Sequence, residues 1–196
     1  MPTSSHDLVR GTTGNDTLDG GHGNDVMSGW LYMPQRQHAE INADTGDDLM
    51  IGGSGNDNIF AGGGADTLYG GHGRDYLVGG AGGGAIHGGT GNDYFVFAWA
   101  DLGRTKLNIE PGDAIMDWHE GDRIDVSQFA SRAQPRVAWE QVAPGVAEVT
   151  VVVPGLTAAA TRYTTATFEV RGADVATLDR GDFILGNGDD VHAPPR

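Results

Sequence analysis

A glycine- and aspartate-rich pattern of nine residues recurs through the first half of the chain and limits the folds open to it. We number the positions of each unit as places one to nine. Asp fills place six in most units, and an apolar residue fills place eight in all of them. Repetition at a fixed period indicates a stacked repeat architecture. The eight units are "GTTGNDTLD" from residue 11, "GGHGNDVMS" from 20, "ADTGDDLMI" from 43, "GGSGNDNIF" from 52, "AGGGADTLY" from 61, "GGHGRDYLV" from 70, "GGAGGGAIH" from 79 and "GGTGNDYFV" from 88.

Each unit has room for one very short strand and one tight turn. Places seven to nine hold one apolar side chain between two outward ones, as a strand with one buried face requires. The glycines of the other six places permit the positive-φ backbone of a reversal. Two units then make one coil, and the strands stack in parallel on two faces. We predict an all-β fold, a parallel β-roll, with place eight inward: Leu18, Met27, Met50, Ile59, Leu68, Leu77, Ile86 and Phe95.

Residues 29–42, "GWLYMPQRQHAEIN", interrupt the eight units. They can be read as a ninth unit whose strand is Glu40–Asn42, with Ile41 inward. The preceding loop, residues 29–39, would then be enlarged by five residues over the ordinary six. The extra length introduces Trp30 and Tyr32, whose rings are typical of recognition surfaces, although they also suit a plug at the end of the roll.

The predicted roll has too thin a core to be stable by burial alone. Only 38% of the 196 residues are hydrophobic, and the formal net charge is −15. Stacked turns would bring aspartates and turn carbonyls together, an arrangement that is repulsive without a cation. Ca²⁺ takes six to eight oxygen ligands and suits such a cage. We therefore expect several Ca²⁺ ions to stabilise the fold.

Composition also excludes several classes of partner and bond. The strongly acidic balance argues against nucleic-acid binding. The chain has no cysteine, so disulfides and thiolate metal sites are absent. No 18-residue apolar run suggests a transmembrane segment, and "MPTSSHDLVR" lacks the apolar core of a cleavable signal peptide.

These units resemble the G-G-x-G-x-D-x-U-x repeat of RTX (haemolysin-type) calcium-binding proteins. The stretches "DAIMDWHEGDRIDVSQF" at 113–129 and "GADVATLDRGDFIL" at 172–185 resemble the C-terminal domain of serralysin-type exported proteins. The resemblance covers roughly residues 11–186. It implies a right-handed β-roll that folds on binding Ca²⁺ outside the cell or at its surface, after export by a type I secretion system. It carries calcium ligands over to the carboxylates of Asp16, Asp25, Asp48, Asp57, Asp66, Asp75 and Asp93 and to turn carbonyls at Gly14, Gly23, Gly46, Gly55, Gly64, Gly73 and Gly91.

Glycine thins after residue 97, and ordinary strand-like runs begin. We expect an N-terminal tail at 1–10, the roll at 11–96, a C-terminal β-rich cap with the secretion-signal region at 97–186 and a flexible tail at 187–196. The strands expected near 136–142, 146–153 and 165–171 need a partner surface, and one outward face of the roll would serve. Those faces carry Phe60, Tyr76, Val78, Tyr94 and Val96 on one side and Leu49, Ile51, Tyr69 and His87 on the other.

Some positions depart from the pattern or have two interpretations. Gly84 replaces the place-six Asp, which should weaken the site shared with the turn of Asp66. The chain also continues beyond "DFIL", where similar chains commonly end. His22 and His72 are expected to face solvent, and a transition-metal role is the less favoured alternative. Local cap hydrogen bonds are favoured over one more ion site for a last group of acids, which consists of Asp113, Asp117, Asp122 and Asp125.

Three classes of function remain. No HExxH, GxSxG or GK[ST] loop is present, and only ten residues precede the first repeat, so we expect a non-enzymatic, calcium-folded extracellular module. The first alternative is an adhesin-like module that binds a glycan or protein through an exposed roll face or the loop at 29–39. The second is the C-terminal fragment of a larger exported enzyme. The loop residues proposed to contact a partner are Trp30, Tyr32, Met33 and His38.

Overall fold

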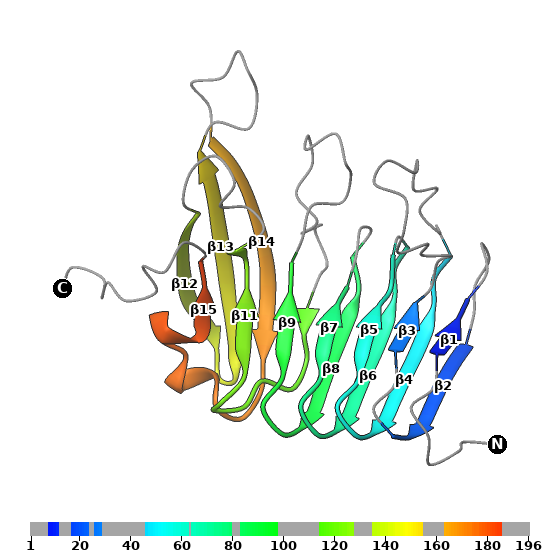
Figure 1. Ribbon diagram of the computed structural model, residues 1–196. Helices are drawn as coiled ribbons and strands as arrows, with labels where there is room; N and C mark the ends of the chain where they lie inside the picture. Colours follow the sequence, from blue (N-terminus) through cyan, green and yellow to red (C-terminus); the bar gives the residue numbers. More distant parts are fainter. Residues whose placement is uncertain are drawn as a thin grey trace.

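Two β-sheets lie face to face along the length of the molecule (Figure 1). The structure is a computed structural model, and it describes residues 8–11, 17–23, 26–28, 46–62, 64–79, 83–97, 114–127, 135–154 and 163–185. In order across sheet A, the described strands are β1 (Leu8–Arg10), β3 (Val26–Ser28), β5 (Asn58–Phe60), β7 (Tyr76–Val78), β9 (Tyr94–Val96), β11 (Arg123–Asp125) and β15 (Phe183–Ile184). In order across sheet B, they are β2 (Thr17–His22), β4 (Leu49–Ser54), β6 (Thr67–His72), β8 (Ala85–Thr90), β10 (Ala114–Ile115), β14 (Tyr163–Arg171), β13 (Val146–Pro154) and β12 (Arg136–Ala143).

The repeat units fold as the sequence predicts. Places seven to nine of every unit are strand, successive units alternate between the sheets, and neighbouring roll strands pair in parallel. The place-eight side chains form one column between the sheets, and none is more than 7% exposed. The predicted all-β parallel β-roll is therefore confirmed.

Glycine is required in the turns for both backbone conformation and space. Gly71 and Gly73, at places two and four of one unit, have φ of 113° and 126°. A Cβ on Gly73 would also overlap the carbonyl oxygen of Gly55, which occupies the same place one coil earlier. A side chain at place four would thus strain its own residue and separate the stacked turns.

The pairing of the first strands corrects the nine-unit interpretation. Strand β2 pairs with β4, so that Thr17 lies beside Leu49, and β3 pairs with β5, so that Val26 lies beside Asn58. A unit at 29–42 would have shifted the alternation and placed residues 49–51 in sheet A. Residues 29–42 are therefore an insertion between two units. The proposed inward side chain, Ile41, lies outside the described residues.

The parallel stacking extends beyond both ends of residues 11–96. Residues 8–10, assigned from the sequence to an N-terminal tail, form β1 and pair with β3. After β9, the parallel pairing continues through β10 against β8 and through β11 against β9. Each sheet thus gains a strand whose sequence lacks the glycine pattern.

The C-terminal strands prolong sheet B instead of covering a face of the roll, which corrects the predicted packing. Strand β14 pairs in parallel with β10, and β14, β13 and β12 pair with one another in antiparallel fashion. Aromatic pairs fill the space between the sheets at this end, with ring centroids 4.4 Å apart for Phe97 and Phe168 and 5.3 Å apart for Trp139 and Phe183. Two short 3₁₀ helices, η2 (Val175–Thr177) and η3 (Arg180–Asp182), precede β15. None of the helices in the described residues is long and apolar enough to span a bilayer.

Candidate metal centre

Among the described residues, place-six aspartates line the turns as buried rows, with one carboxylate in each unit except that of Gly84. On the edge where β4, β6 and β8 lead into β5, β7 and β9, Asp57, Asp75 and Asp93 are each 1% exposed. The Oδ1 atoms of Asp75 and Asp93 each accept the backbone N–H of the aspartate one coil earlier. The N···O distance is 2.8 Å from Asp57 to Asp75 and 2.9 Å from Asp75 to Asp93. These bonds join neighbouring coils and hold the carboxylates in fixed positions.

The second carboxylate oxygen provides the strongest sign of a cation site. Oδ2 of Asp75 and Oδ2 of Asp93 are buried and have no hydrogen-bond partner among the described residues. A buried carboxylate oxygen is costly unless a hydrogen bond or a cation compensates it. The residues at these two positions therefore fit a bound cation, and Ca²⁺ is the cation that prefers such oxygen ligands.

Glycine at place one leaves the space beside that oxygen. A Cβ added to Gly88 would lie 2.5 Å from Oδ2 of Asp93, and one added to Gly70 would lie 2.6 Å from the carbonyl oxygen of Gly88 and close to Oδ2 of Asp75. Gly70 and Gly88 are not among the glycines with positive φ. Space at the carboxylate, not backbone conformation, therefore requires glycine here.

The electrostatics of the row oppose ionisation when no cation is bound. Burial raises the pKa of Asp75 to about 7, and the carboxylates of Asp93 and Asp57 add to this increase, against the opposing effect of the N–H of Asp57. Burial likewise raises the pKa of Asp93 to about 6. A dication beside these groups would favour their charged forms.

Side chains alone do not supply a complete coordination shell. No group of three or more His, Asp or Glu side chains gathers as a metal site within the described residues. A cation held by the row would therefore need backbone carbonyls as well. The place-four carbonyls remain the predicted donors, and the carbonyl of Gly88, at place one, is a further candidate donor near Oδ2 of Asp75 that the sequence interpretation missed. Its only sequence signal is the first glycine of each "GG" pair. The predicted residues Gly14, Asp16 and Asp25 lie outside the described residues.

A second row, on the opposite edge, is interrupted where the sequence places Gly84. Asp48 and Asp66 are buried there, and the N–H of Asp48 donates to Oδ1 of Asp66 at 2.9 Å. One coil later, a Cβ on Gly84 would lie 2.5 Å from the carbonyl oxygen of Asp66, so Gly84 is stacked on Asp66 in the predicted register. Glycine supplies no carboxylate, and the row stops at this coil.

The acids after the roll close its end through hydrogen bonds. Asp122 is fully buried. Its Oδ1 accepts the N–H of Asp93, and its Oδ2 accepts the N–H of His119, both at 2.9 Å. Asp117 accepts the N–H groups of Gly88 and Gly89, beyond the end of the shorter neighbouring strand β10. The favoured cap interpretation holds for these two.

The remaining members of the group of acids are less informative. Oδ1 of Asp125 accepts a local hydrogen bond from the backbone N–H of Ser127, at an N···O distance of 2.8 Å. Asp113 lies outside the described residues. Asp125 therefore also fits the cap interpretation, and Asp113 stays a prediction.

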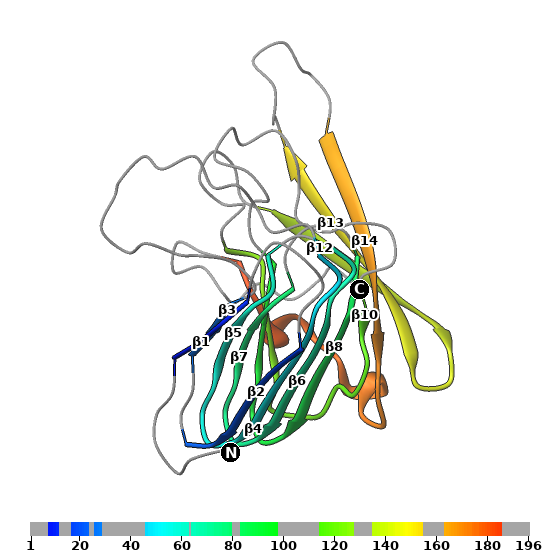
Figure 2. The same cartoon turned by 90° about the vertical axis from the view of Figure 1, so that its right-hand side faces the viewer.

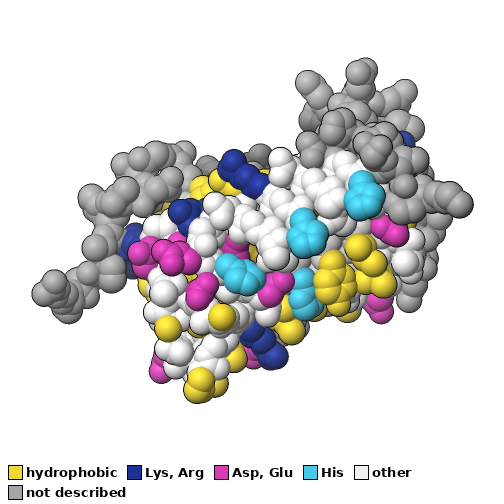
Figure 3. Space-filling model, turned by 90° about the horizontal axis from the view of Figure 1, so that it is seen from below, with side chains coloured by type: hydrophobic (Ala, Val, Ile, Leu, Met, Phe, Trp, Pro, Cys, Tyr) yellow, Lys and Arg dark blue, Asp and Glu magenta, His cyan; other side chains and the backbone are white. Residues whose placement is uncertain are grey.

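Side chains at places three and five form an outer polar network that the sequence interpretation overlooked. The Nδ1 atoms of His22 and His72, both exposed, lie 2.6 and 2.7 Å from hydroxyls of Ser54 and Thr90 on the next coil. Histidines appear along the underside of the molecule (Figure 3). At place five, Oδ1 of Asn56 accepts the N–H of Arg74. Both histidines thus join neighbouring coils.

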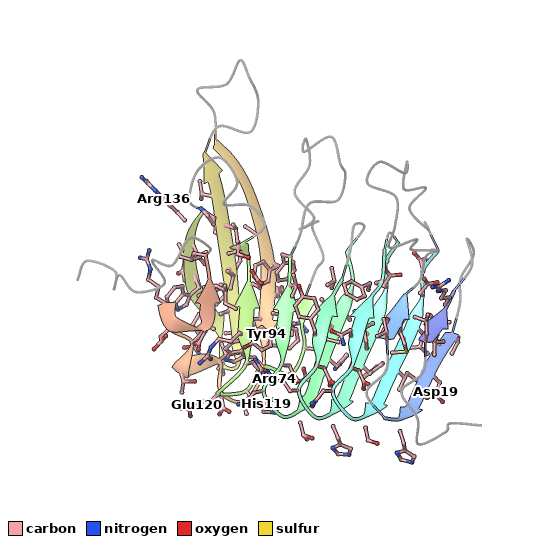
Figure 4. The ribbon with its side chains drawn as sticks, viewed as in Figure 1. Asp19, Arg74, Tyr94, His119, Glu120 and Arg136 are labelled. Atoms are coloured by element: carbon pink, nitrogen blue, oxygen red, sulfur yellow. The ribbon has the colours of Figure 1, made fainter. Side chains whose placement is uncertain are left out.

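Outward aromatic side chains lie on both sheets. On sheet A, Tyr94 of β9 contacts Arg74 from the turn before β7. The guanidinium of Arg74 lies 4.7 Å from the centroid of the Tyr94 ring and donates to the Tyr94 hydroxyl (Figure 4). On sheet B, the rings of Tyr69 and His87 stack with centroids 4.5 Å apart, and Tyr69 is 40% exposed. The predicted partner-binding residues of the loop, Trp30, Tyr32, Met33 and His38, lie outside the described residues.

The repeat units match a known family model, and two solved structures are similar to the chain. A family model described as the RTX calcium-binding nonapeptide repeat (four copies) matches residues 3–31, 40–68 and 51–85. The AlgE6R2 subunit of the Azotobacter vinelandii mannuronan C5-epimerase has 19% identity and a TM-score of 0.46, over 92% of this chain and 93% of that one. The AlgE6R3 subunit of the same enzyme has 22% identity and a TM-score of 0.32, over 97% and 84%. No curated protein matches the chain.

Proposed function

RTX calcium-binding nonapeptide repeats build the β-roll of this chain, and we propose that the whole is a non-enzymatic module that folds when Ca²⁺ binds outside the cell. In this proposal the place-six carboxylates and turn carbonyls hold several ions between successive coils. The ions neutralise carboxylates that the fold would otherwise bury with their charge. Calcium binding and folding are then the same event, because the site does not exist in the unfolded chain.

The observation that supports this function best is the pair of buried oxygens on Asp75 and Asp93. Each lies beside a glycine whose missing side chain leaves space, and neither has a hydrogen-bond partner in the described residues. The two carboxyls also have pKa values raised by burial. These features are unfavourable in a protein that folds without a cation and are resolved by a bound one.

A secreted location and export through a type I system complete the proposal. Weak affinity, on the order of 10⁻⁴ to 10⁻³ M as in extracellular calcium modules, would leave the chain unfolded at cytosolic calcium concentrations. Folding would follow export. The support is the RTX repeat itself, since exported proteins are where such repeats are typical.

A calcium titration followed by far-UV circular dichroism tests the folding step. We expect EGTA-treated protein to lack most of its β signal and to regain it with a midpoint in the range above, while Mg²⁺ at the same concentration does not substitute. Asp75→Asn should weaken this response. Asp47→Asn is the matched control, because Asp47 is exposed and its Oδ1 accepts the N–H of Ala65, which an amide oxygen can also do. Full β structure in EGTA at neutral pH would contradict the proposal.

A second candidate function rests on the outward face of sheet B. The stacked Tyr69 and His87 rings give a flat aromatic surface of the kind that binds sugars or protein side chains. A glycan- or protein-binding module would lose binding in Tyr69→Ala and keep its calcium-dependent folding. Screening of the calcium-loaded protein against glycan and protein arrays, with Phe60→Ala on sheet A as the control, distinguishes the two functions.

A further inference from the structure

The N-terminal end of the roll presents two open strand edges. Strand β1 is the last strand of sheet A and β2 the last of sheet B, and no described strand pairs with their outer edges. Figure 2 views the molecule from this end, with both strands toward the reader. At the other end, the sheets finish in β15 and β12, among the aromatic pairs of the cap.

Apolar side chains are also less covered at this end. Leu8 is 61% exposed and Val26 is 39% exposed, and the pairing of β1 with β3 makes them neighbours. The inward residue of β1, Val9, is only partly buried, whereas Ile59 and Leu77 in the same column are fully buried. An open strand edge beside exposed apolar side chains favours pairing with another strand.

We infer that a second copy of this chain docks on this edge, so that β1 of each copy pairs antiparallel with β2 of the other. The roll strands of sheet A (β1 to β9) and those of sheet B (β2 to β8) point in opposite directions (Figure 1). A two-fold axis parallel to the strands turns the roll end to end and exchanges the two sheets, which brings β1 against β2 in opposite directions. Both sheets then continue from one copy into the other, and four open edges are paired.

Charge favours this arrangement over the alternative two-fold dimer, in which β1 would pair with β1 of the second copy. Arg10 ends β1, Asp19 lies in β2, and both side chains are exposed (Asp19 is labelled in Figure 4). Val9 must stay inward, opposite Leu18 or Gly20 of the second copy, because these are the buried residues of β2. In either register, Arg10 lies directly opposite Asp19 or diagonal to it. The alternative axis would pair β1 with β1, and with Val9 opposite Val9 the two Arg10 residues would be diagonal to each other, so that like charges and not opposite charges would be neighbours across the edge.

Cross-linking between single-cysteine variants tests the pairing directly, because the chain has no cysteine of its own. Arg10→Cys and Asp19→Cys protein are mixed with saturating Ca²⁺ and treated with a short bis-maleimide. We expect a product of twice the 20.5-kDa chain mass from the mixture, and little from either variant alone. Arg10→Cys mixed with Val142→Cys, an exposed position in β12 at the far end, is the control and should give none.

Sedimentation of the unlabelled protein, with folding checked by circular dichroism, supplies an independent measurement. Calcium-loaded wild type should be dimeric, Arg10→Glu and Asp19→Lys should each shift it toward monomer, and the two changes combined in one chain should restore the dimer. Leu8→Lys serves if a charge variant fails to fold. A folded wild type that stays monomeric would overturn the inference. So would efficient cross-linking of Arg10→Cys alone, which would indicate the other two-fold.

Discussion

Replacing Asp75 by Asn should stabilise the calcium-free roll even though it removes a proposed ligand. The fold raises the pKa of Asp75 to about 7, chiefly by burial, from an ordinary 3.8. At about 1.4 kcal/mol for each pH unit, the calcium-free fold disfavours the ionised carboxylate by about 4 kcal/mol. An amide removes that charge, keeps an acceptor for the N–H of Asp57, and can donate to the nearby carbonyl of Gly88.

The pH dependence has a definite sign. Unfolded Asp75 ionises near its ordinary pKa of 3.8 and folded Asp75 near 7, so the folded state retains the proton through that interval. The contribution of Asp75 to stability without calcium is therefore highest below about pH 4 and falls as pH rises to about 7. Asp93, with its pKa raised to about 6, acts in the same direction. Bound Ca²⁺ reverses the preference, since it requires the ionised form.

Circular dichroism of EGTA-treated protein across this pH range measures the effect. Wild type should show more β structure at about pH 5 than at about pH 7.5. Asp75→Asn should retain more β structure than wild type at the higher pH, and its advantage should disappear near pH 4. Asp47→Asn should behave as wild type. If Asp75→Asn is no more structured than wild type at the higher pH without calcium, burial of its charge is not what destabilises the calcium-free roll.

Further substitutions probe other parts of the roll. Asp75→Ala should raise the calcium midpoint more than Asp66→Ala, because the row of Asp66 stops at Gly84; equal midpoints in a circular dichroism titration would argue against two unequal rows. Gly73→Ala should prevent calcium-dependent folding, since the new methyl would overlap a carbonyl of the preceding coil at a positive φ; a normal titration curve would show that the stacked turns can separate. Asp122→Asn should lower the free energy of unfolding of calcium-loaded protein by about 1–3 kcal/mol, through loss of a buried acceptor. The number of Ca²⁺ ions bound, measured by calorimetry, should not change in Asp122→Asn, and loss of an ion would make Asp122 a ligand.

The fold of the repeat units could be predicted because it depends on residues that are close together in the sequence. Place eight in every unit specifies an inward apolar side chain, and the structure buries each one, from Leu18 to Phe95. The defect at Gly84 followed from the same register. Each of these conclusions needs only the spacing of residues within one or two coils.

What the sequence did not predict depends on contacts between distant segments. Nothing local distinguishes an insertion at 29–42 from an enlarged unit, because the choice rests on which strand β4 pairs with. Strands β10 and β11 lack glycine-rich turns, so their place in the roll shows only in pairing with β8 and β9. The strands β12, β13 and β14 could bury their apolar side chains either against an outer face of the roll or by extending one of its sheets. The structure shows the second arrangement, because β14 pairs with β10 of sheet B.

The buried carboxylate bonds give the roll a direction. In each described case a backbone N–H finds its acceptor on an aspartate later in the chain: Asp48 on Asp66, Asp57 on Asp75, Asp75 on Asp93, and Asp93 on Asp122. A coil therefore has all of its hydrogen-bond acceptors only after the coil that follows it in the chain has packed against it. As the roll folds, the last coil to form lacks its acceptor, and the row of Asp57, Asp75 and Asp93 ends at Asp122, whose second oxygen accepts the N–H of His119 within its own turn. Each coil of this row therefore depends on the coil that follows it, and the last acceptor comes from Asp122, a residue outside the repeat units.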